Sequence, residues 1–142
     1  MASSTAYAVK AALFAAIRSL PEAAAEAWDI DFGFSKNPER TWVYCGGIDW
    51  ESSEWVTNRT REEVYTITAV VNVKRRRATP ADAEGEAVRI MGLIESYVNA
   101  NNRLGVFGVE LAELVPKKLD SMPSDDFCEA QFEASVRVTA RF

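Results

Sequence analysis

This 142-residue chain contains no histidine. Histidine is the commonest general base and metal ligand in proteins, so its absence excludes Ser–His and Cys–His nucleophile pairs and histidine-based zinc sites. Cysteine is scarce as well, because Cys45 and Cys128 are the only two and form no CxxC motif. Two thiols cannot build an all-cysteine zinc site, and we expect both to be reduced. The composition points away from catalysis, and neither a cofactor nor a metal is expected.

Long apolar runs are also missing, since none approaches the ~18–20 residues of a membrane span. No signal-peptide pattern stands at the start of the chain, so neither membrane insertion nor secretion is expected. The formal net charge is −5, with 21 acidic and 16 basic residues, which does not favour binding to nucleic acid through phosphate neutralisation. Hydrophobic residues make up 48% of the chain, and its length predicts a single domain over residues 1–142.

Two segments have the pattern of amphipathic helices. The first begins near Ser3, Ser4 or Thr5, which can cap it, and ends before Pro21, and residues 22–27 can add a helical turn. Its apolar positions recur at helical spacing: Val9, Leu13, Ala16, Ile17 and Leu20.

The second helix begins with a capping-box pair, Thr79 and Asp82, and ends near residues 101–102. Gly85 and Gly92 share one side of it, which indicates either tolerated glycines or close packing on a neighbour. Its apolar face consists of Ala83, Ala87, Ile90, Met91, Ile94, Tyr97 and Val98.

Alternating apolar and polar residues predict five strands. They span residues 28–34, 41–45, 63–74, 109–115 and 128–142. The last strand is unusually long, so part of it can project beyond the domain or bend across a sheet, and its one polar face also makes it a natural sheet edge for subunit pairing.

The intervening segments predict loops. Residues 35–40 indicate a turn, the glycines at 46–47 loosen the second strand, residues 48–61 indicate a hairpin tip or a long loop, and residues 116–126 indicate a polar loop.

The order of these elements predicts an α+β fold with a mainly antiparallel sheet of about five strands. An N-terminal helix and a long central helix pack on one side of that sheet. We expect the apolar face of the central helix to contact the strand face that carries Tyr65, Ile67, Ala69 and Val71.

Three groups of side chains are candidates for contact with partners. Trp50 and Trp55 lie in a polar segment, where exposed aromatics typically act as interface anchors, and the alternative is that both fold back onto their own domain. The basic side chains that we expect to meet acidic partner surfaces are Lys74, Arg75, Arg76, Arg77, Arg137 and Arg141. A solvated turn is the simpler interpretation of residues 74–77.

The carboxylates Asp49, Glu51 and Glu54 surround the two tryptophans. Such a cluster can bind a hard cation, but the spacing matches no EF-hand. Paired acids beside tryptophans can also hydrolyse a glycoside. An interaction segment is the favoured interpretation.

In the order and residue pattern of these segments, the chain resembles the tail-terminator proteins of long-tailed bacteriophages, the small subunits that cap the tail tube. The resemblance covers nearly the whole chain and depends on element order and size rather than on a catalytic signature. The segments that carry it are the N-terminal amphipathic helix and residues 28–34, 42–44 with the Gly-Gly that follows, 63–71, 79–84 and 135–141.

The resemblance implies a homohexameric ring in the virion, at the head-proximal end of the tail, assembled in the host cytoplasm. The implied partners are further copies of the chain, the major tail-tube protein, the head-closure or neck connector protein, and genomic DNA that passes through the channel without sequence-specific binding. Six copies with a net charge of −5 each carry −30, so acidic side chains in the channel would repel DNA. Asp49, Glu51 and Glu54 are the channel-facing candidates.

Two other functional classes stay open from the sequence. The chain can be another neck or tail component, such as a head-closure subunit or a tail-tube protein. It can also be a monomeric ligand-binding domain or a carbohydrate enzyme without histidine. The native mass separates a ring from a monomer.

Overall fold

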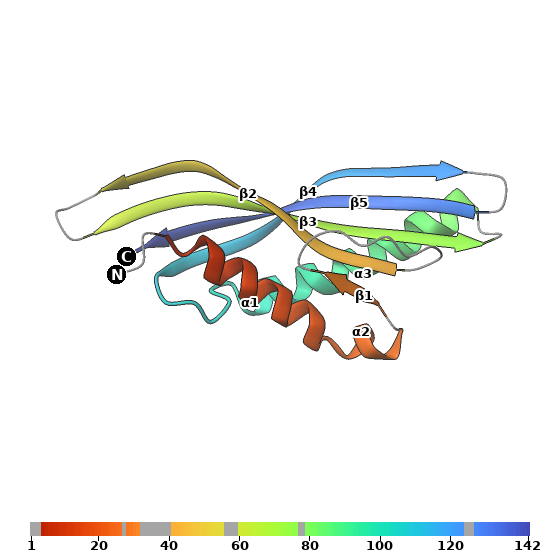
Figure 1. Cartoon of the computed structure of the whole chain (residues 1–142), viewed down its shortest axis with the longest axis horizontal. Helices are drawn as coiled ribbons and strands as arrows, with labels where there is room; N and C mark the ends of the chain where they lie inside the picture. Colours follow the sequence, from red (N-terminus) through yellow and green to blue (C-terminus); the bar gives the residue numbers. More distant parts are fainter. Residues whose placement is uncertain (1–3, 27, 32–40, 56–59, 77–78, 124–126) are drawn as a thin grey trace.

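A computed structural model describes residues 4–26, 28–31, 41–55, 60–76, 79–123 and 127–142. Over these residues, helices lie on one side of a five-stranded sheet whose strand order is β1-β2-β3-β5-β4 (Figure 1). The elements are α1 (Ala6–Ser19), α2 (Pro21–Ala25), β1 (Asp29–Asp31), β2 (Thr41–Trp55), β3 (Arg61–Arg76), α3 (Pro80–Ala100), β4 (Val109–Pro123) and β5 (Phe127–Arg141).

The sheet is mixed but mainly antiparallel, which confirms the predicted α+β class. Only β1 runs parallel to its neighbour β2, and the other three pairs are antiparallel. The four long strands have 15 or 16 residues each, and a strand of that length spans roughly 50 Å. The result is an elongated sheet, and Thr5 and Phe142 both lie beside Gly108 at one end of it (Figure 1).

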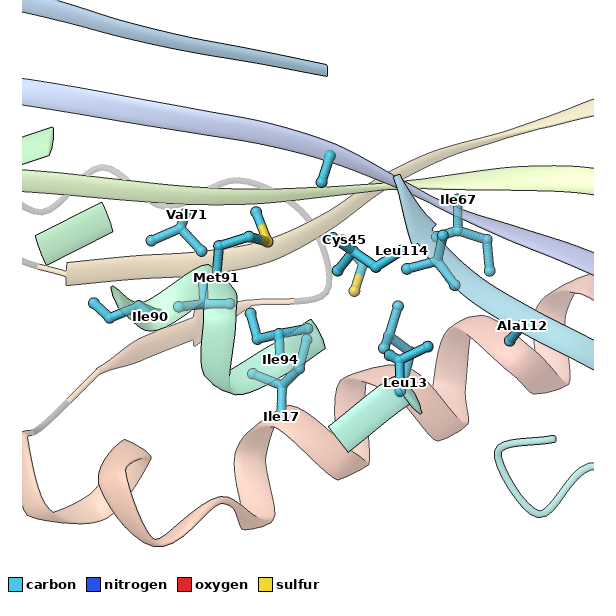
Figure 2. Packing of buried hydrophobic residues seen from close by; sticks show 14 of the residues in the cluster. Leu13, Ile17, Cys45, Ile67, Val71, Ile90, Met91, Ile94, Ala112 and Leu114 are labelled. Atoms are coloured by element: carbon cyan, nitrogen blue, oxygen red, sulfur yellow. The ribbon is translucent and has the colours of Figure 1, made fainter. Parts of the chain in front are cut away.

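The core lies between the helices and one face of the sheet. Leu13 and Ile17 from α1 and Ile94 from α3 meet side chains of the central strands, including Ile67 and Val71 (Figure 2). The predicted packing partners of α3 on β3 are all fully buried: Tyr65, Ile67, Ala69 and Val71. The amphipathic patterns therefore predicted both apolar faces correctly.

The helix ends follow the sequence signals. The Thr79 hydroxyl accepts a hydrogen bond from the Asp82 amide, and the Asp82 carboxylate accepts one from the Thr79 amide, which is a complete capping box. Thr5 precedes α1 but does not cap it with its side chain. The Ser4 hydroxyl accepts from the Ala6 amide instead, because the Thr5 hydroxyl bonds to Glu63.

The predicted polar loop at residues 116–126 and the long-loop alternative for residues 48–61 are wrong, because the described parts of both segments mostly continue strands. The hairpin alternative for residues 48–61 agrees with the antiparallel pairing of β2 and β3. β2 extends to Trp55 and pairs with β3 over most of the segment predicted as a hairpin tip or long loop. β4 extends to Pro123 and pairs with β5 through the predicted polar loop. β2 contains a register shift at the glycines 46–47, and β4 contains one near Pro116. Such shifts break the alternation of apolar and polar residues by which a strand is recognised in a sequence.

The predicted edge position of the last strand is also wrong. β5 lies between β3 and β4 and pairs with both along its length. Its apolar face is buried under the helices as predicted, but its backbone groups are used within the chain. The edge strand on this side of the sheet is β4.

Parts of other predictions lie outside the described residues. They are the second half of the strand at 28–34, the turn at 35–40 and Arg77. The described part of that strand is β1, and the predicted turn after Pro21 is α2.

Candidate assembly surfaces

The basic cluster lies at the end of β3 that precedes α3. Lys74 and Arg76 lie over the Phe127 ring, with the Lys74 amine 5.2 Å and the Arg76 guanidinium carbon 5.3 Å from the ring centroid. Arg75 points to the other face and donates to the Thr41 hydroxyl at 2.5 Å. The positive charges of these three residues are thus held in defined positions at one end of the sheet.

The two tryptophans lie at the opposite end of the sheet from the basic cluster. They belong to a segment that we call the β2–β3 arm, which consists of residues 48–55 of β2 and residues 61–67 of β3. Trp50 is 51% exposed, and its indole nitrogen donates to Glu63 at 3.4 Å while its ring lies 6.2 Å from that of Tyr65. Trp55 is 62% exposed, with the Arg61 guanidinium 5.7 Å from its ring centroid. Both rings keep an exposed face, as an interface anchor requires.

The three predicted acids share this arm, and all three are exposed. Glu51 accepts hydrogen bonds from Arg137 on β5, with an oxygen–nitrogen distance of 3.1 Å to the terminal guanidinium nitrogen. Arg137 also lies 3.9 Å from Glu113 on β4. Its charge is therefore partly compensated within the chain, which makes Arg137 a weaker candidate for partner contact than the sequence indicates.

The strand register places like charges beside each other on the same arm. Glu54 lies directly opposite Glu62, and Arg141 is the partner of Glu62 on the other side. Like charges at directly opposed positions destabilise a sheet. The excess of carboxylates at this end of the molecule is thus a feature that the isolated subunit does not need for its own stability.

The predicted site residues consequently form two separate groups. The carboxylates, the tryptophans, Arg137 and Arg141 lie at the arm, and Lys74, Arg75 and Arg76 lie at the other end of β3. The structure brings no single catalytic pocket together from them.

Sequence analysis missed Glu63, which is fully buried. One carboxylate oxygen accepts from the Ser4 hydroxyl at 3.1 Å, and from the Thr5 amide and hydroxyl, each at 2.8 Å. The other oxygen accepts from Trp50. A negative charge here also faces the positive end of the α1 dipole. The sequence did contain one indication of this role. Glu63 lies two residues before Tyr65, on the same face of β3, where an acidic side chain is unexpected.

The free strand edges are a second feature that the sequence did not predict. β4 pairs with β5 on one side only, and β2 pairs with β1 only over Trp42–Tyr44 within the described residues. β4 also carries four exposed large apolar side chains: Leu111, Val115, Leu119 and Met122. Unpaired backbone groups beside apolar side chains are typical of a surface that another chain covers.

The described parts of the chain hold no group of three or more potential metal ligands. Both cysteines are buried free thiols, and burial raises the pKa of Cys45 to about 11, so this thiol is protonated at neutral pH. Burial likewise raises the pKa of Tyr65 to about 12. None of the helices described is both long and apolar enough to cross a bilayer.

Comparison with solved structures finds a similar fold in a chain of the virion of a native gene transfer agent particle. The TM-score is 0.53 at 15% sequence identity, and the similarity covers 92% of this chain and 94% of that chain. No protein-family model matches the chain. No curated protein matches it. The likeness shows a common fold over nearly the full length of both chains.

Proposed function

We propose that this chain is a structural protein of a virion, and that it acts as the tail terminator. In this role, six copies form a ring at the head-proximal end of the tail tube, stop its polymerisation and dock to the neck. The observation that carries the proposal is the fold shared over nearly the whole chain with a protein of a gene transfer agent virion. The order and size of the elements, which resemble those of tail terminators, support the finer assignment.

The surfaces of the molecule fit an assembled subunit better than an enzyme. The edge of β4 and the tryptophans of the β2–β3 arm are exposed and apolar, while the predicted site residues do not meet in one pocket. We therefore propose a non-enzymatic role, with the tail-tube protein and the neck connector as partners on the two faces of the ring. DNA passes through the ring, whose formal charge of −30 disfavours retention of phosphates.

Two measurements test this function. The native mass of the chain alone is expected at six times 15.7 kDa, about 94 kDa, and with tail-tube protein the complex is expected to contain six copies of the chain. A phage strain that lacks the chain is expected to make tails of uncontrolled length or tails that do not join heads. Tails of normal length attached to heads in that strain would falsify the terminator role. Open-ended tubes formed by the purified chain alone would instead assign it as a tube protein.

A further inference from the structure

The loop between α3 and β4, residues 101–108, carries the most exposed large apolar side chain of the described residues. Phe107 is 92% exposed. We call this segment the Phe107 loop. A fully solvated phenyl ring gains nothing for the fold of its own chain, and large exposed apolar groups are typical of contact sites.

The Phe107 loop holds this side chain outward on a well-fixed backbone. Asn102 and Gly108 both accept hydrogen bonds from the sheet, from the Ala112 amide at 2.6 Å and from the Arg141 amide at 2.7 Å. Leu104 is buried with a φ of 51°, a left-handed conformation that costs energy for a residue other than glycine. The exposure of Phe107 is therefore built into the loop rather than caused by a frayed chain.

A complementary hollow lies elsewhere on the surface, between α3 and the sheet. It has a volume of about 180 Å³, and an apolar cavity of ~150 Å³ accommodates a benzene ring. Gly92 opens it, because a Cβ atom added there would meet nothing within 4 Å. We call it the α3–β4 groove, and its lining consists of Val88, Met91, Gly92, Glu95, Leu114, Pro116 and Phe132.

Charges on the two surfaces are also complementary. Glu95 is the one charged residue of the groove lining and is half-buried. Arg103 on the Phe107 loop is exposed. A ring flanked by a cation thus matches an apolar hollow flanked by a carboxylate.

Phe107 cannot fill the groove of its own chain. Phe132, which lines the groove, and Arg141, whose amide bonds to Gly108 beside Phe107, are nine residues apart on β5, which corresponds to ~30 Å of strand. The loop and the groove are different patches, so a contact between them joins two copies head to tail. Such a heterologous contact repeats from copy to copy and closes into a ring when the rotation permits.

We propose that Phe107 of one copy inserts into the α3–β4 groove of a second copy, with Arg103 of the first beside Glu95 of the second. The inference deepens the proposed ring and rests on it, because it names the contact that joins neighbouring subunits. It also accounts for Gly92, whose missing side chain leaves the groove open in the middle of a helix.

Two single variants test each half of the contact. Phe107→Ser removes the ring from an exposed position, and Gly92→Leu fills the groove from a position with free space, so both chains are expected to fold. Each is expected to be monomeric at concentrations at which the wild-type chain is assembled, measured by native mass spectrometry and light scattering. Tyr7→Ser is the matched control, since Tyr7 is 73% exposed on α1 and lies in neither surface. It is expected to assemble as the wild type does.

Mixing the two variants tests the head-to-tail arrangement. Phe107→Ser retains its groove and Gly92→Leu retains its loop, so one contact can form and no ring can close. The expected product is a heterodimer of about 31 kDa, twice the chain mass. Arg103→Glu and Glu95→Arg are each expected to weaken assembly at least tenfold, and the double variant with both changes is expected to restore it.

The results of these experiments distinguish a failure of the proposed contact from a failure of the proposed ring. A wild-type ring together with unchanged assembly of Phe107→Ser and Gly92→Leu overturns the contact and leaves the ring proposal standing. Loss of assembly by both variants from an oligomer that is not a hexamer supports the contact and overturns the ring stoichiometry. Variants that form rings but fail to join tails assign the groove to another virion protein. A wild-type chain that stays monomeric even with tube protein overturns both proposals.

Discussion

At the scale of single residues, Glu63 is a carboxylate whose hydrogen bonds link the start of α1 to β2 and β3. It is fully buried, yet it accepts hydrogen bonds from Ser4, Thr5 and Trp50. The Thr5 hydroxyl is also 2.8 Å from the Tyr65 hydroxyl, so one carboxylate organises the start of α1 and the base of the β2–β3 arm. A buried charge is tolerated only when it is bonded in this way.

We expect Glu63→Ala to lower the free energy of unfolding by roughly 2–4 kcal/mol, because charge-assisted hydrogen bonds are lost and buried donors are left without an acceptor. Urea denaturation followed by circular dichroism measures this. Glu62→Ala is the matched control on the neighbouring position of β3. Its removal relieves the repulsion from Glu54, so stability should change by less than about 0.5 kcal/mol. Equal effects of the two substitutions would show that the carboxylate is not structurally required.

At the scale of elements, α3 packs against the sheet through one apolar, buried face. Ala83, Ala87, Ile90 and Ile94 are all buried at 1% exposure or less. On the opposite side, Arg89 forms ion pairs with Glu86 and with Glu26, which follows α2. The helix therefore contacts the sheet with its apolar face and Glu26, at the end of α2, through Arg89.

Ile94→Ala is expected to cost roughly 2–5 kcal/mol of stability, because it leaves a cavity between α3 and the sheet. Thermal and urea unfolding of dilute protein measure the change. Val88→Ala, on the exposed side of the same helix, should change stability by less than about 0.5 kcal/mol. A melting temperature of Ile94→Ala equal to that of the wild type would remove Ile94 from the core.

The position of β5 leads to a prediction about the end of the chain. Residues 138–141 pair with β3, residues 138–140 also pair with β4, and the Arg61 and Phe142 backbones exchange two hydrogen bonds. We expect their deletion to abolish cooperative unfolding rather than to affect assembly alone, since both neighbouring strands lose partners. Circular dichroism melts measure this. A truncated chain that melts as the wild type does but no longer assembles would contradict the central position of β5.

The same elements show what the sequence can predict. The buried faces of α1, α3, β3 and β5 follow directly from their periodicity, because each is regular and one-sided. The outer halves of β2 and β4 do not, since these edge segments are exposed on both faces and interrupted by register shifts. The order of strands is a non-local property, so a long alternating segment at the chain end does not reveal that β5 is central.

The surfaces proposed for assembly are the features that the sequence reveals least, for a physical reason. Trp50 and Trp55 stood out because aromatics are rare in polar segments. Phe107 did not, because its exposure depends on the left-handed backbone at Leu104 and on a hydrogen bond from Arg141 of the distant β5. A hollow such as the α3–β4 groove likewise depends on three elements that are far apart in the chain.

At the scale of the whole molecule, the proposed ring would give the carboxylates of the β2–β3 arm a role that they lack in an isolated subunit. Asp49, Glu54 and Glu62 lie on the arm, and two of them repel each other across the strands. If the arms of six copies line the channel, these groups keep DNA mobile by repulsion. Under the proposed ring, we therefore expect the arm to be the part of the subunit most sensitive to charge reversal.

The test is the triple variant Asp49→Lys, Glu54→Lys and Glu62→Lys, in which each substitution adds two positive charges. The net charge then changes from −5 to +1 per chain, and from −30 to +6 per ring. We expect particles with this variant to release DNA more slowly, with a delay that shrinks as salt rises, because phosphate contacts are screened. The control, Glu22→Lys with Glu84→Lys and Asp120→Lys, makes the same change in net charge away from the arm and should release DNA at the wild-type rate. Equal delays in the two variants would mean that total charge alone governs release and that the arm does not line the channel.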